Sequence, residues 1–176
     1  MEIPQTSSSV GVEVIPASLE QEPIVANLLE LYAHDFSEFI DLKLGVNGRF
    51  GYEQLPLYWK EPDRYPFLIR VNGHWAGFVF VRRGSQISGD VNIWDVAEFF
   101  IVRGYRRVGV GRNVEQEVWE KFPGTWEVRV IDRNPKAKYF WGCAINEFLG
   151  EMIEPLPFDK DGEGWHVFSF ESKRAA

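Results

Sequence analysis

Residues 98–112, EFFIVRGYRRVGVGR, place four arginines and three glycines between an apolar run and a segment with helical periodicity. Arginines in the first turn of a helix are unfavourable, because the helix N-terminus already carries partial positive charge. A bound anion would offset that cost, and the unpaired N–H groups of a helix N-terminus can hold one. The stretch therefore indicates either an anion site or a surface loop with solvated arginines.

The length and composition of the chain favour one compact domain. It has 176 residues, of which 45% are hydrophobic and 15% aromatic, which suffices for a single core. No apolar run is long enough to span a bilayer, and the first residues lack the basic and hydrophobic regions of a signal peptide. We therefore expect a cytoplasmic protein without membrane association.

Charge and cysteine content narrow the classes of ligand. The net charge is −7, so the arginines of residues 103–112 are a local feature that suits a small anion better than nucleic acid. The single cysteine, Cys143, excludes an internal disulfide, and the three histidines show no metal-ligand spacing. We expect no structural metal and no nucleic-acid partner.

Hydrophobic periodicity predicts an α/β (α+β) domain over residues 12–171, with tails at 1–11 and 172–176. Ser18 and Gln21 have capping-box spacing ahead of the first helix, and Asn72-Gly73 predicts a hairpin. Residues 41–66 are expected to form mainly a long loop. The expected strands are 12–15, 67–71, 75–82, 91–102, 126–131, 150–154 and 164–171, and later helices cover 109–121 and 135–146. The order is β-α-(loop/α)-β-β-β-α-β-α-β-β.

Two familiar phosphate-binding designs do not fit the opening stretch. A P-loop needs a lysine and then Ser or Thr after its last glycine, whereas Gly111 is followed by Arg112 and Asn113. A dinucleotide fingerprint needs a third glycine, and Val114 occupies that position. What remains is a strand, a glycine-rich turn and a helix start.

Arg106-x-x-Gly109-x-Gly111, after a strand that ends in FFIV, resembles the Q/R-x-x-G-x-G/A signature of the GNAT superfamily of N-acetyltransferases. The later stretch WEVRVIDRNPKAKYFWGCAI, residues 126–145, resembles the strand and helix that follow in that family. The specific motifs cover about residues 94–145, and the order of elements is similar from residue 12 to 171. The resemblance implies a mixed, mostly antiparallel sheet flanked by helices, with acetyl-CoA as co-substrate.

The resemblance also implies roles for individual residues. Backbone groups of Phe100, Ile101 and Val102 would pair with the pantetheine arm, and the loop from Arg107 to Arg112 would hold the pyrophosphate. The implied cofactor residues are Phe100, Ile101, Val102, Arg106, Arg107, Val108, Gly109, Val110, Gly111, Arg112, Asn134, Ala137, Phe140 and Trp141.

Several of these residues also have a plain structural explanation. Asn134 before Pro135 is a good helix N-cap. Ala137, Phe140 and Trp141 belong to a helical stripe that would face the core in any protein. Cys143 has no Cys/His arrangement around it and is expected to be a packing residue.

The expected chemistry is acetyl transfer to a primary amine, which needs a base to take a proton from the ammonium. Strand alternation would point Val96, Glu98, Phe100 and Val102 to one side, and Ala97, Phe99 and Ile101 to the other. Glu98 is therefore a carboxylate within an apolar strand, where burial would raise its pKa toward the useful range. We take Glu98 as the candidate base, with Asp95 and Asp35 in reserve, against the alternative that Glu98 is solvated or pairs with an arginine.

One residue departs from the family pattern. Trp141 stands where many members have a tyrosine proposed to protonate the leaving thiolate, and an indole N–H is not a practical acid. The source of that proton is left open.

The acceptor is the least specified part. Acidic residues before and within residues 41–66, together with the aromatics there, would attract and pack on a cationic amine, although those aromatics could equally lie in the core. We name Asp35, Phe36, Tyr58 and Trp59 as acceptor-side candidates. Small amines, amino-sugar antibiotics, amino acids and protein amines all remain open. So does the rival class, a noncatalytic acyl-CoA-binding domain, and so does the oligomeric state, although homodimers are common in the family.

Overall fold

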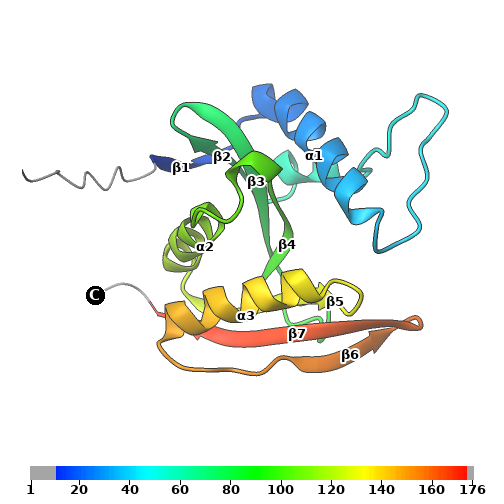
Figure 1. Ribbon diagram of the computed structural model, residues 1–176. Coiled ribbons are helices and arrows are strands. Elements are labelled where there is room, and N and C mark those ends of the chain that lie inside the picture. Colours follow the sequence, from blue (N-terminus) through cyan, green and yellow to red (C-terminus); the bar gives the residue numbers. More distant parts are fainter. Residues whose placement is uncertain (1–10, 174–176) are drawn as a thin grey trace, which may run out of the picture.

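The computed structural model describes residues 11–173 and shows one sheet with helices on both faces (Figure 1). The strands are β1 (Val12–Pro16), β2 (Arg64–Val71), β3 (His74–Arg83), β4 (Trp94–Ile101), β5 (Gly124–Ile131), β6 (Leu156–Lys160) and β7 (Glu163–Ser172). The α-helices are α1 (Glu22–Phe36), α2 (Val110–Lys121) and α3 (Pro135–Leu149), with 3₁₀ helices η1 (Leu19–Gln21), η2 (Leu55–Trp59) and η3 (Arg103–Tyr105).

The seven strands form one mixed sheet in the order β1-β2-β3-β4-β5-β7-β6. Every neighbouring pair is antiparallel except β4 and β5, which are parallel. The β2–β3 turn has positive φ at both Asn72 and Gly73, as the two-residue hairpin requires. The mostly antiparallel sheet and the order of elements confirm the predicted fold class.

β4 and β5 separate soon after they meet. They pair only at Trp94 with Trp126 and at Asp95 with Glu127, so β4 beyond Asp95 has a strand partner on its β3 side alone. Figure 1 shows the result as two arms, β1–β4 with α1 and β5–β7 with α3, which meet where β4 joins β5. We call the space between the two diverging strands the strand opening.

Two hydrophobic clusters hold the helices to opposite faces of the sheet. α2 and α3 pack on one face around Trp119, Trp126 and Phe168. α1 and η2 pack on the other around Leu68, Phe78 and Phe80. The strand opening is therefore reached from an α1 side and from an α2–α3 side.

The expected alternation along β4 is wrong at one residue. Phe80 of β3 pairs with Glu98 whereas the next residue, Val81, pairs with Val96, so Ala97 is an extra residue in β4. This bulge puts Val96 in the α2–α3 cluster, while Glu98 reaches side chains of the α1 side. A one-residue insertion reverses which face the later side chains occupy, and periodicity alone does not reveal it.

Three element boundaries also differ from expectation. β4 spans Trp94–Ile101, shorter than 91–102, and β2 begins at Arg64, inside the expected loop, which also holds η2. The strand expected at 150–154 is absent, because Gly150 ends α3 with a φ of 72° and the strand forms only at Leu156.

The expected tails fall mostly outside the described residues, at 1–10 and 174–176. Gly11 and Ser172 do not behave as tail residues. Gly11 donates a 3.1 Å hydrogen bond to Asn72 Oδ1, and the Ser172 hydroxyl donates to the Trp119 carbonyl. Within residues 11–173, no helix has the length and hydropathy needed to cross a bilayer.

Candidate active site

The loop between β4 and α2 presents backbone N–H groups in one place. Arg107 and Gly109 have positive φ values of 65° and 86°, and Gly109 is the N-cap of α2. Within residues 11–173, no atom accepts a hydrogen bond from the N–H groups of Arg107, Val108 or Gly109. With the first N–H groups of α2 beside them, these donors form what we call the N–H cradle.

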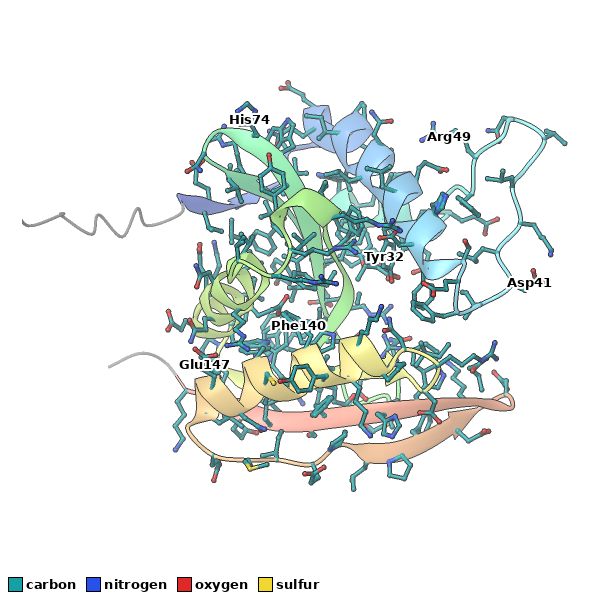
Figure 2. The ribbon with its side chains drawn as sticks, viewed as in Figure 1. Tyr32, Asp41, Arg49, His74, Phe140 and Glu147 are labelled. Carbon is teal, nitrogen blue, oxygen red and sulfur yellow. The ribbon has the colours of Figure 1, made fainter. Side chains whose placement is uncertain are left out.

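Gly111 allows α2 to lie close to α3. A Cβ at this position would come within 3.0 Å of the Phe140 ring and 3.5 Å of Phe99. Figure 2 shows Phe140 between α2 and α3, next to the strand opening. The second glycine of the motif is thus required by packing, and Gly109 by its backbone conformation.

Most arginines of the opening stretch are already paired. Arg106 donates from Nε to the Ile101 carbonyl at 2.6 Å and from Nη2 to Asp35 at 2.7 Å. Arg103 donates to the other oxygen of Asp35 at 2.6 Å, and Arg112 pairs with Glu147 at 2.8 Å. Arg106 therefore fixes the loop to β4 and α1.

Arg107 differs from its neighbours, because no acidic side chain in residues 11–173 forms a salt bridge with it. Arg107 is an exposed residue of the loop that forms the N–H cradle. Of the arginines predicted to contact the cofactor, it is the one without a salt bridge to an acid in residues 11–173.

Asp35, the reserve base, is held by Arg103 and Arg106. Burial raises the pKa of this carboxyl, but the two arginines outweigh that effect and hold it below its usual range. Asp35 therefore anchors the loop, and a carboxylate with a lowered pKa is a weak base.

The backbone of residues 100–102 is partly engaged. The Val102 N–H donates to the Ala76 carbonyl at 2.8 Å, and the Ile101 carbonyl accepts from Arg106. Phe100 is buried on the α1 side and Ile101 on the α2–α3 side. Only the backbone N–H and C=O groups of β4 that point away from β3 can therefore pair with a ligand in the strand opening.

α3 supplies an aromatic wall beside the strand opening. Asn134 Oδ1 accepts from the Ala137 N–H at 3.0 Å, so it caps the helix as its plain explanation requires. Phe140 stacks on Phe99 with ring centres 5.8 Å apart, and Trp141 lies 5.3 Å from the same ring. Trp141 is 7% exposed and belongs to the core.

Glu98 lies on the other side of β4, among tyrosines. Its Oε2 accepts a 2.6 Å hydrogen bond from the Tyr32 hydroxyl, and its Oε1 accepts a 3.1 Å bond from Tyr52. Figure 2 shows Tyr32 between α1 and the sheet. Burial raises the pKa of Glu98, while the two tyrosines and the nearby Arg129 and Arg82 limit the rise. The result is a half-buried carboxyl with a raised pKa, as a general base needs.

Glu98 lines an open, mostly polar cleft of about 450 Å³. Its walls come from the loop before η2, from β3 and the loop after it, and from β4 and β5. The lining residues are Gly51, Tyr52, Glu53, Gln54, Arg82, Gln86, Ala97, Glu98 and Arg129. We call this the Glu98 cleft. It lies on the α1 side, opposite the aromatic wall of α3.

Asp95, the other reserve base, supports a wall of the Glu98 cleft. It is fully buried and pairs with Arg82 at 2.8 Å and with Arg129 at 3.1 Å. These bonds orient the two guanidinium groups. Of the three candidate bases Glu98, Asp95 and Asp35, only Glu98 lines the cleft.

The acceptor-side candidates are not brought together in the cleft. Tyr58 is 2% exposed and stacks on Phe80, and the Trp59 indole donates to the Ala17 carbonyl at 2.8 Å. Phe36 stacks on Tyr32 at the end of α1. The sequence interpretation did not name Tyr32, Tyr52, Arg82 or Arg129 as site residues. Only the aromatic content of residues 41–66 pointed toward one of them, Tyr52.

No protein-family model matches the sequence, and no curated protein is significantly similar to it. Solved structures are similar in fold. An acetyltransferase from Thermus thermophilus has a TM-score of 0.66 at 16% identity, covering 90% of this chain and 97% of its own. An acetyltransferase of the GNAT family from Staphylococcus aureus has a TM-score of 0.58 at 15% identity, with coverage of 90% and 98%.

A third similar structure is the spermidine N-acetyltransferase from Vibrio cholerae in complex with CoA and spermine. Its TM-score is 0.63 at 14% identity, and the match covers 92% of this chain and 95% of that one. Together with the strand opening and the N–H cradle, these likenesses show that the chain has the fold of the GNAT acetyltransferases.

Proposed function

We propose that this protein is an N-acetyltransferase that moves an acetyl group from acetyl-CoA to a primary amine, with Glu98 as general base. The observation that carries the proposal is the position of Glu98 in a cleft beside the strand opening, with a raised pKa and two tyrosine donors. The fold likeness supports it, since the Vibrio cholerae spermidine N-acetyltransferase has CoA bound.

The residues present fit acetyl-CoA. The N–H cradle and the Arg107 side chain would hold the pyrophosphate, and the unpaired side of β4 would pair with the pantetheine arm. Phe140 would line the path beside β4. Acetyl-CoA supplies a thioester, whose acetyl carbon is attacked by the amine.

Glu98 performs the proton chemistry at the amine. Its carboxylate accepts a proton from the acceptor ammonium, which frees the nitrogen lone pair to attack the acetyl carbon as the carbon–sulfur bond breaks. Tyr32 and Tyr52 hold the carboxylate in place. Thiols have a reference pKa near 8.5, so the sulfur can leave as thiolate. The nitrogen loses its second proton as the amide forms, and that proton can pass through water to the thiolate.

Trp141 favours a second candidate function, a noncatalytic acyl-CoA-binding domain. Trp141 is buried, and its indole cannot act as an acid. In this reading the N–H cradle would bind the coenzyme and Glu98 would have no reacting partner.

A thiol-release assay with a panel of amines separates the two functions. Wild-type protein should release free CoA only when an amine is present, and Glu98→Gln should lower kcat by about 10²- to 10⁴-fold. Thermal shift should show stabilisation by both acetyl-CoA and CoA in both proteins. Binding without turnover of any amine would favour the noncatalytic domain, and no shift with either coenzyme would rule out both functions.

A further inference from the structure

We propose that the acceptor amine carries a carboxylate, as a free amino acid does, and that Arg82 and Arg129 bind that carboxylate in the Glu98 cleft. This inference rests on the proposed transferase function and names the class of its acceptor. Sequence composition pointed only to a cationic amine and left amino acids as one of several open classes.

The first support is the state of the two guanidinium groups. Both side chains are mostly buried, at 15% exposed for Arg82 and 19% for Arg129, and both are oriented by the fully buried Asp95. Asp95 accepts hydrogen bonds from only some of their N–H donors. Among residues 11–173, nothing accepts a hydrogen bond from Nη1 or Nη2 of Arg82 or from Nη1 of Arg129.

The second support is the balance of charge. Asp95 is the only acidic side chain of residues 11–173 that forms a salt bridge with either arginine, so the two guanidinium groups share one direct counter-charge. Glu127, also buried nearby, accepts a 2.6 Å hydrogen bond from the Ser85 hydroxyl. A fixed pair of planar guanidinium groups with free N–H donors is the arrangement that binds a carboxylate.

The third support is the distance from the base. Arg82 lies two residues along β3 from Phe80, the partner of Glu98, and same-face residues in a strand are about 7 Å apart. Arg129 lies on β5 just past the last residue paired with β4, so it borders the strand opening together with Glu98. One small ligand can therefore meet the base and the guanidinium groups together.

The remaining lining agrees with a zwitterionic ligand. Glu98 and the exposed Glu53 supply negative charge, the arginines supply positive charge, and Gln54 and Gln86 are neutral donors and acceptors. A polyamine such as spermidine has no group that the arginines could bind. An amino acid offers an ammonium to Glu98 and a carboxylate to the arginines.

The test compares free L-amino acids with their carboxamides, and includes spermidine as an amine without a carboxylate. Wild-type protein should acetylate at least one amino acid with a kcat/KM at least tenfold above that of its carboxamide. Arg129→Lys keeps a positive charge for Asp95 but loses the planar fork, so it should reduce that ratio at least threefold. Arg83→Gln, an exposed neighbour of Arg82, is the control and should leave the ratio unchanged.

The outcomes separate this inference from the proposed function. Carboxamides or spermidine acetylated as well as the amino acids would overturn the carboxylate site and leave the transferase standing. An unchanged ratio in Arg129→Lys would also overturn it. A protein that binds acetyl-CoA yet acetylates no amine would overturn the transferase function, and the inference with it.

Discussion

The Tyr32 hydroxyl lies 2.6 Å from Glu98 Oε2, joining the first long helix to the fourth strand across 66 positions of sequence. Tyr52, from the loop before η2, bonds the other oxygen of the same carboxyl at 3.1 Å. Two segments distant from the glycine-rich motif thus hold the carboxyl that we propose as the general base. They also set the direction in which its pKa responds to mutation.

Tyr32→Phe should move the acid limb of the pH–rate profile to higher pH. The lost hydrogen bond favours the charged carboxylate, so its removal raises the Glu98 pKa further, and activity requires the deprotonated form. A hydrogen bond to a charged group is worth about 1.5–3 kcal/mol. One pKa unit corresponds to about 1.4 kcal/mol, so the midpoint of the kcat/KM profile should rise by about one to two units. The exposed Tyr139→Phe is the control, and a midpoint that stays in place in Tyr32→Phe would show that Glu98 does not set this limb.

Gly111→Ala should weaken coenzyme binding and lower stability. The added methyl would meet the Phe140 ring at 3.0 Å, so this ring has to shift within the contact between α2 and α3, at a cost of about 1–3 kcal/mol. Gly104→Ala is the matched control, because nothing lies within 4 Å of a Cβ there. Calorimetric titration with CoA and thermal melting should show weaker binding and a lower melting temperature in Gly111→Ala only. Equal CoA affinities in the two variants would show that the Phe140 ring moves aside.

Arg106→Ala should lower stability, whereas Arg107→Ala should weaken coenzyme binding. Arg106 holds the Ile101 carbonyl and Asp35, so its loss should cost about 1 kcal/mol of stability, measured by urea unfolding. Arg107 makes no salt bridge with the described residues, so its loss should leave the unfolding midpoint unchanged. It should instead weaken CoA binding about tenfold. Undiminished CoA affinity in Arg107→Ala would place the pyrophosphate elsewhere.

Asp95→Asn should destabilise the protein strongly. The substitution leaves Arg82 and Arg129 without their buried counter-charge, which costs about 3–5 kcal/mol when one partner of a buried ion pair is removed. Glu98→Gln should cost far less, because it keeps a polar group beside the tyrosines. Denaturant melts of the two variants test the difference, and equal stability would mean that Asp95 does not support the wall.

Glu115→Gln should stabilise the protein at neutral pH. Glu115 is completely buried in α2, and neither oxygen accepts a hydrogen bond from residues 11–173. Burial raises the pKa of this carboxyl well above its ordinary value of 4.5, so the folded state loses stability as pH rises above 4.5. The variant removes that loss, and it should gain about 1–3 kcal/mol at pH 7 but little at pH 4. Melts over this pH range test it, and a pH-independent difference would contradict the assignment.

The sequence by itself determined most of the elements and the motif on which the proposed coenzyme site rests. Helical and strand periodicity, Asn72-Gly73 and the Arg106–Gly111 motif are local signals, because each arises from backbone conformation or side-chain spacing within a few residues. Glu98 was also identified from sequence, as a charged residue in an apolar strand. Its pairing with Tyr32 and Tyr52 was not.

Only the tertiary structure decided which residues form the Glu98 cleft, the site that we propose for the acceptor. The bulge at Ala97 turns Glu98 toward α1, and residues from four separate segments then meet in the Glu98 cleft. Tyr58, an acceptor candidate from sequence, instead lies in the core, while Arg82 and Arg129 meet only through Asp95. These contacts join residues distant in the chain, and register and burial fix them. Spacing along the sequence carries no signal for either, since a shift of one residue sends a side chain to the other face.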